Sequence, residues 1–286
     1  MQRRCRWANG EILQASRFCA FCERSDSASS AILRCAMIDL ACIRMIWQRD
    51  TIRYFREKSQ IIGSITRSIL WLFIMGMGLR GAAQSVQGYS YTQFIFPGIV
   101  AMTIIFTSIQ SAITIIWDRE FGFLKAVLVA PVPRTSIAIG KCLAGTTLSL
   151  IQATIILLFS PLVGVRFNLI NIPAIYGVII LLSFALTGVG VLIASRMTSF
   201  QGFGTIMNFV IMPMWFLSGA MFPPTNLPVW LNLLMHVNPL TYGVDLVRRL
   251  ILNIGFYSPW FDIAFLAGFS VVITTIAVFF FNRGEY

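Results

Sequence analysis

Long apolar stretches, separated by short polar or charged segments, fill the chain from about residue 60 onward. A helix that crosses a bilayer needs about 20 consecutive, mainly apolar residues. The stretches that meet this length are 61–79, 94–117, 142–165, 172–195, 203–222 and 263–281. The pattern therefore predicts an all-α integral membrane protein with six transmembrane helices within residues 61–286.

Arg67 is the one charged residue inside the first stretch. An arginine in hydrocarbon is costly unless it reaches the interface or faces a polar interior. Because Arg67 lies about two turns from the start of the stretch, its long side chain can extend to the interface.

Residues 37–60 combine regularly spaced apolar positions with a basic face, which predicts an amphipathic helix before the first span. We expect this elbow helix to lie in the cytoplasmic interface, with its cations toward lipid headgroups. A solvated cytoplasmic helix is the alternative. The basic residues assigned to it are Arg44, Arg49, Arg53 and Arg56.

The segment between the second and third spans begins with charged residues and continues with an apolar run that is too short to cross a bilayer. Prolines end this run. Such a segment predicts a short helix at the cytoplasmic surface that docks into a groove of a partner; an ordinary polar loop is the alternative. The residues assigned to this contact are Asp118, Arg119, Glu120, Phe121, Gly122, Phe123, Lys125, Pro131 and Arg134.

The fifth connection contains an apolar stretch, 227–237, that is also too short to span, and a second segment, 241–252, after a proline. We predict two short re-entrant helices that dip into the outer leaflet, with Asp245 facing Arg248 and Arg249 at i+3 and i+4. A peripheral loop is the alternative. Irregular backbone at this depth must pack against other helices. The residues assigned to this motif are Ser218, Gly219, Pro223, Pro224, Asn238, Pro239, Tyr242, Asp245 and Arg248.

Composition agrees with a membrane class, because 57% of residues are hydrophobic, 12% are charged and the mean hydropathy is +0.78. A formal charge of +11 could indicate nucleic acid, but no basic face interleaved with aromatic residues accompanies it. Eleven basic residues precede the first span, and four more lie between the second and third. Since positive loops stay in the cytoplasm, we expect both termini there.

The first 36 residues differ in character from the remainder and hold four of the six cysteines. We expect either a disordered tail or an upstream extension, with initiation at Met37 or Met45, and no signal peptide. The pair Cys19-x-x-Cys22 lacks further ligands nearby, so no metal site is expected.

Four motifs in fixed order carry a resemblance: Asp-Arg-Glu-Phe-Gly-Phe-Leu-Lys at 118–125, Leu-Val-Ala-Pro-Val-Pro-Arg at 128–134, Ser-Gly-Ala-Met-Phe-Pro at 218–223 and Asn-Pro-Leu-Thr-Tyr at 238–242. From about Met37 to its end, the chain resembles the ABC type-2 permease family, especially the branch of drug-resistance and nodulation-factor exporters. Ala126 departs from that branch, where an acidic residue is common.

The resemblance implies a six-helix permease with cytoplasmic termini in a bacterial inner membrane, an elbow helix and a coupling helix at about 118–130. It also implies two permease copies, as a homodimer, bound to two copies of a separate ATPase subunit. The only Gly-Lys pair, Gly140-Lys141, is followed by Cys142, so the chain lacks a phosphate-binding loop. We therefore expect no enzyme activity and no cofactor in this chain, with ATP used by the partner subunit.

No charged residue lies in the second to fifth predicted spans, which favours an amphipathic substrate such as a drug, lipid or glycan-lipid over a buried ion relay. An ion-coupled secondary transporter or channel is the main alternative. Its one acidic candidate is Asp262, whose position at the edge of the last span indicates the interface. A membrane-embedded enzyme is the third class, and His236 with Asp245 is all the outer side offers it.

Overall fold

The computed structural model describes residues 39–78, 88–120, 133–165, 168–197, 199–222 and 228–283. The expected extension at 1–36, most of the expected coupling helix, and Pro223 and Pro224 lie outside these residues. The described helices, in chain order, are α3 (Leu40–Arg56), α4 (Lys58–Gly78), α5 (Tyr91–Ser111), α6 (Ile113–Glu120), α8 (Arg134–Leu158), α9 (Ile172–Arg196), α10 (Phe200–Phe216), α11 (Val229–Val237), α12 (Pro239–Leu252) and α13 (Pro259–Arg283), with short 3-10 turns at Ser160–Val163 and Leu169–Asn171.

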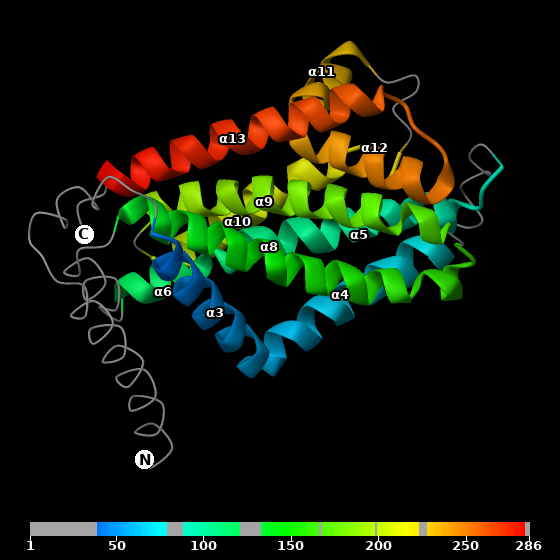
Figure 1. Ribbon diagram of the computed structural model, residues 1–286. Coiled ribbons are helices and arrows are strands. Elements are labelled where there is room, and N and C mark those ends of the chain that lie inside the picture. The colour runs from blue at the N-terminus through cyan, green and yellow to red at the C-terminus, as the bar shows by residue number, and fades with distance from the viewer. Residues whose placement is uncertain are drawn as a thin grey trace, which may run out of the picture.

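The long helices α5, α8, α9 and α13 run side by side along the molecule (Figure 1), and α5 packs against α4, α8, α9 and α12. The side chains of α5 between Phe94 and Ile109 are all buried, because neighbouring helices surround it. Helices α3 and α4 form a V at one edge of the bundle (Figure 1), in which α3 packs on α8 and α4 on α5.

Four helical segments are long and apolar enough to cross a membrane, judged by length and composition within the described residues. They are Tyr91–Glu120, Arg134–Leu158, Ile172–Arg196 and Pro259–Phe281. The chain is therefore an all-helical, multi-pass membrane protein, as the sequence predicts. Helices α4 and α10 occupy the other two predicted spans, and α10 has only 17 residues.

Several boundaries differ from the prediction, among them the end of α8 at Leu158 rather than at residue 165. At two others, a paired charge and a glycine turn explain the difference. Helix α8 begins at Arg134 rather than at residue 142, since the charge of Lys141 is paired inside the helix bundle. Helix α10 ends at Phe216 rather than at residue 222. The chain turns after Phe216, and Gly219 in this turn adopts a left-handed φ of 68°.

The turn at 217–222 is held by side chains of the following helices. Arg248 donates a hydrogen bond to the Gly219 carbonyl at 2.8 Å, and the amide nitrogen of Asn238 donates one to the Met214 carbonyl at 2.6 Å. Ser218 and Gly219 are buried, as expected of irregular backbone that packs against other helices; the same expectation for Pro223 and Pro224 falls outside the described residues.

The predicted pairing of Asp245 with both arginines is only half correct. Arg249 lies 3.5 Å from the Asp245 carboxylate. Arg248 instead turns toward the Gly219 carbonyl, with its guanidinium carbon 4.2 Å from the centre of the Phe94 ring. The reason is that Arg248 is fully buried, where the open carbonyls of the turn need a donor.

Close packing between α8 and its neighbours gives a test of this arrangement. A Cβ atom added at Gly145 would lie 2.3 Å from Ser111 Oγ and 2.5 Å from Thr187 Cγ2, whereas one added at Gly177 meets nothing within 4 Å. We expect Gly145→Val to destabilise the bundle by about 1–3 kcal/mol, as overpacking does, and to lower the melting temperature in detergent. Gly177→Val is the control, and an equal loss in both variants would contradict this packing.

Candidate functional site

Five charged side chains from three helices meet at the end of the bundle where α6 ends and α8 begins. Lys141 of α8 lies 2.7 Å from the carboxylates of both Asp50 on α3 and Asp118 on α6. Arg49 bridges the same two carboxylates, at 2.8 Å from Asp50 and 2.5 Å from Asp118. Arg53 completes this ion cluster at 3.8 Å from Asp118.

The ion cluster lies inside the protein, since Asp50, Asp118 and Lys141 are each 4% exposed. Burial alone raises the pKa of Asp50, but the nearby charges of Lys141 and Arg49 outweigh it and lower that pKa below its usual value. Burial likewise lowers the pKa of Arg49, and the two carboxylates raise it above its usual value. Asp50 and Arg49 therefore both favour their ionised forms, and each stabilises the charge of the other.

Local contacts place α3 against α8 so that these charges meet. Asp39 caps α3 by accepting a hydrogen bond from the Ala41 amide at 2.9 Å, and its own amide donates to Ser136 Oγ at 2.9 Å. The apolar face of α3 then packs on α8, where Gly140 leaves room for Ile46.

This packing changes the interpretation of the elbow helix. Arg49 and Arg53 pair with the buried carboxylates of Asp50 and Asp118. Arg44 and Arg56 are exposed. The helix ends at Arg56 rather than at residue 60, and α4 begins at Lys58.

The structure describes four of the nine residues assigned to partner contact. Asp118 belongs to the ion cluster, and Arg119 donates hydrogen bonds to the Met197 and Ser195 carbonyls at 2.7 and 3.1 Å, at the C-terminal end of α9. Glu120 is exposed, and Arg134 begins α8. Phe121, Gly122, Phe123, Lys125 and Pro131 lie outside the described residues.

The seven described residues of the re-entrant motif, all except Pro223 and Pro224, are buried. Pro239 is the first residue of α12, the side chain of Tyr242 donates to the His236 carbonyl at 2.8 Å, and Ser218 Oγ donates to the Trp215 carbonyl at 2.6 Å. Helices α11 and α12 correspond to the two predicted short helices and have nearly the same bounds.

Sequence reasoning missed the ion pair of Asp50 and Lys141, because Asp50 received no assignment and Lys141 was counted only as a positive charge between the second and third spans. The signal available in the sequence was the presence of isolated opposite charges at the edges of neighbouring apolar segments. Asp50 is the only acidic residue in 40–56, Asp118 ends the second apolar stretch, and Lys141 begins the third. Contrary to expectation, Asp118 and Lys141 both lie within helices long enough to span a membrane.

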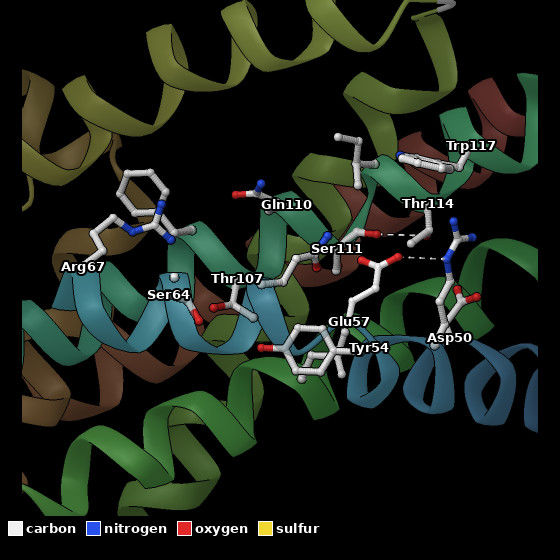
Figure 2. Close-up of a pocket in the computed structure, with 16 residues that line it drawn as sticks. Asp50, Tyr54, Glu57, Ser64, Arg67, Thr107, Gln110, Ser111, Thr114 and Trp117 are labelled. Carbon is white, nitrogen blue, oxygen red and sulfur yellow. Dashed lines mark hydrogen bonds and ion pairs between the residues drawn. The ribbon is translucent and has the colours of Figure 1, made fainter. Parts of the chain in front are cut away.

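A cavity of about 290 Å³ opens beside the ion cluster, between α3, α4 and the α5–α6 segment. Asp50 and Glu57 line one end of the cavity, and Arg67 lies toward the other (Figure 2). Arg53, 3.7 Å from Glu57, also lines the cavity, and Arg67 lies over the ring of Phe106 at 4.0 Å. Thr107, Gln110 and Ser111 of α5 contribute polar groups to its wall (Figure 2). The cavity is therefore both polar and apolar, as an amphipathic occupant requires.

The fold and the cavity define a polytopic helical membrane protein with an internal polar site. Comparison with known proteins narrows this class. The family model described as ABC-2 type transporter matches residues 41–252.

A transport permease, ycf38, of Cyanophora paradoxa is 30% identical over 80% of this chain and 82% of its own. Nodulation protein J of Rhizobium leguminosarum bv. viciae is 26% identical over 73% and 81%, and the inner membrane transport permease YadH of Escherichia coli K12 is 24% identical over 83% and 91%. The chain thus belongs to the ABC-2 type transporter family, whose members matched here are transport permeases and not enzymes.

The ion cluster predicts a large effect of a small substitution. Asp118→Asn removes a negative charge that faces Arg49 and Lys141, and breaking a buried pair typically costs about 3–5 kcal/mol. We expect a clear drop in melting temperature in detergent. Glu120→Gln is the matched control, since it makes the same charge change two residues away at an exposed position. Equal melting temperatures for the two variants would show that the cluster does not stabilise the fold.

Proposed function

We propose that this chain is the membrane half of an ATP-driven exporter in a bacterial inner membrane. Two copies of it, as a homodimer, bind two copies of a separate ATPase subunit, which supplies ATP hydrolysis. Six membrane crossings, including α4 and α10, leave both termini in the cytoplasm. The cargo is an amphipathic molecule that leaves the cytoplasm or the inner leaflet.

The observation that carries this proposal is the position of the ion cluster next to segment 121–132. Asp118 lies three residues before that segment and is joined to α3 and α8 through Arg49 and Lys141. Arg119 joins the same turn to the end of α9. A push on the segment by a closing ATPase would therefore reach three further helices, which is what a coupling element must do.

The charge pattern supports the same orientation. Arg119, Arg134 and Arg196 all lie at the end of the bundle that carries the ion cluster, and positive loops favour the cytoplasm. The amphipathic cargo is supported by the mixed lining of the cavity.

Topology is tested by tags at three positions. We expect tags at both termini to be reachable only from the cytoplasm, and a tag inserted between Pro224 and Leu227 only from outside, measured by labelling with a membrane-impermeant reagent. Termini found on opposite sides of the membrane would exclude six crossings.

Coupling is tested by Glu120→Lys, because Glu120 is exposed at the start of the proposed docking segment. The reversal replaces an attraction by a repulsion if the ATPase presents a cation, which typically costs about 2–5 kcal/mol at a desolvated contact. We expect normal insertion and melting temperature, with loss of ATPase co-purification and of export. Gly122→Val should act alike through steric exclusion.

Export by both variants at the unmodified rate, with ATPase bound, would refute the docking assignment. Export without any ATPase would favour the ion-coupled alternative. One observation favours that alternative: the side chain of Asp262, in the first turn of α13, is fully buried in the protein beside Asp245. Asp262→Asn therefore serves as the companion variant, and only the ion-coupled alternative expects it to abolish export that depends on a proton gradient.

A further inference from the structure

A second cavity of about 230 Å³ continues the first one toward α10. The two cavities share Arg67, Phe106, Gln110 and Ile113 as lining residues, so they form one groove along α5, from α3 past α4 to α10. Arg67 lies where the two cavities meet. It is the only charged residue among the described residues that line the second cavity.

The charges around the groove leave Arg67 unbalanced. The cations Arg49, Arg53 and Lys141 face three carboxylates, those of Asp50, Asp118 and Glu57, the last at 3.7 Å from Arg53. Three positive and three negative charges cancel. No carboxylate of the described residues forms a salt bridge with Arg67, whose guanidinium carbon lies 4.0 Å from the centre of the Phe106 ring.

The position of Arg67 makes this charge expensive without a ligand. It lies nine residues after Lys58, the start of α4, which corresponds to about 14 Å along the helix axis. The side chain is partly buried and faces the groove (Figure 2) rather than the outside of the bundle. With α4 as a membrane crossing, as proposed above, an ionisable group at this position that faces a groove marks a functional site whose partner should carry the opposite charge.

The remaining walls of the groove suit the rest of such a ligand. Phe203, Met207 and Ile211 of α10 present buried apolar side chains to the second cavity. The amides of Gln110 and Asn208 lie on the same walls and offer hydrogen bonds to a headgroup beside the guanidinium.

We propose that this groove binds an amphiphile with an anionic headgroup, a phosphate or a carboxylate. The guanidinium of Arg67 holds the headgroup through charge-assisted hydrogen bonds, and the apolar chain lies along α10. This proposal names the substrate class of the transporter proposed above and rests on that function. Its test needs no ATP, so its failure is distinguishable from a failure of ATPase coupling.

The test uses the full chain in nanodiscs of zwitterionic phosphatidylcholine and measures binding by calorimetry. The probes share one chain and differ in headgroup charge: dodecyl phosphate, dodecylphosphocholine and dodecyltrimethylammonium. We expect dodecyl phosphate to bind at least about tenfold more tightly than the other two, the effect of one charged hydrogen-bonded contact. Inorganic phosphate at the same concentration should not displace it, because the chain contributes to binding.

Variants assign the preference to Arg67. Arg67→Gln should abolish the preference for dodecyl phosphate, and Arg67→Lys should retain most of it. Asn208→Asp should also abolish it, by balancing the charge without removing the arginine, which keeps the test valid if Arg67→Gln misfolds. Arg196→Gln is the matched control, since Arg196 also stacks on a phenylalanine ring, that of Phe280, at 4.0 Å, but lies outside the groove.

Equal binding of the three probes, or a preference that survives Arg67→Gln and Asn208→Asp, would overturn the proposal. Complete displacement of dodecyl phosphate by inorganic phosphate would refute the claim that the ligand is an amphiphile, because the site would then bind the free anion. A further contrary result is that Arg67→Gln weakens dimerisation and leaves probe binding unchanged. Arg67 would then pair with a carboxylate of a second copy of this chain.

Discussion

Charge inside a helix bundle in a membrane persists only where it is paired, and the arrangement of α3, α6 and α8 depends on this constraint. Desolvation of a single ion costs several kcal/mol even after relaxation, and a well-placed counter-charge offsets the cost. Asp118 and Lys141 are 2.7 Å apart on different helices. With Arg49 and Asp50 they fix which face of α3 turns inward, so the cluster determines the geometry at the end of the bundle next to segment 121–132.

Three other arginines of the chain show alternative ways to satisfy the same constraint. Arg248 is fully buried and donates to the Gly219 carbonyl, which holds the turn after α10. Arg119 donates to the last carbonyls of α9, where a helix end is negative. Arg67 has an aromatic face and an open groove. The first two are structural, because their acceptors belong to the chain, whereas the groove leaves an acceptor site for a ligand.

The sequence predicted the helices well wherever hydrophobic length alone decides. Helix α9 begins at Ile172 and ends one residue after the predicted span, and α11 and α12 nearly coincide with the two short segments. One error occurred where a charged residue was taken as the edge of a span, at Lys141, and two more at the ends of α8 and α10, where the apolar sequence continues past the helix. A hydropathy pattern cannot show that Lys141 and Asp118 neutralise each other, because their contact joins residues 23 positions apart across two helices.

The candidate site was predicted less well than the fold, for the same reason. The motif at 118–125 drew attention to Asp118 and Arg119 as groups for a partner, yet both bind within the chain. Glu120 alone, of the first three motif residues, faces outward. The order of consecutive charged residues in the sequence does not reveal which face of a helix packs against other helices. For α6 that face is decided by the positions of α8 and α9.

The ion cluster and the groove are not independent sites, because Asp50 and Arg53 belong to both. Arg53 lies 3.8 Å from Asp118 on one side and 3.7 Å from Glu57 on the other. A movement of α6 that separates Asp118 from its cations would therefore change the charge on the wall of the groove. By thermodynamic linkage, a ligand that binds more tightly to one arrangement of Arg53 would shift the equilibrium between the positions of α6 by that difference in binding free energy. In a permease with the coupling segment and the binding groove proposed here, that shared arginine connects the two without a longer pathway.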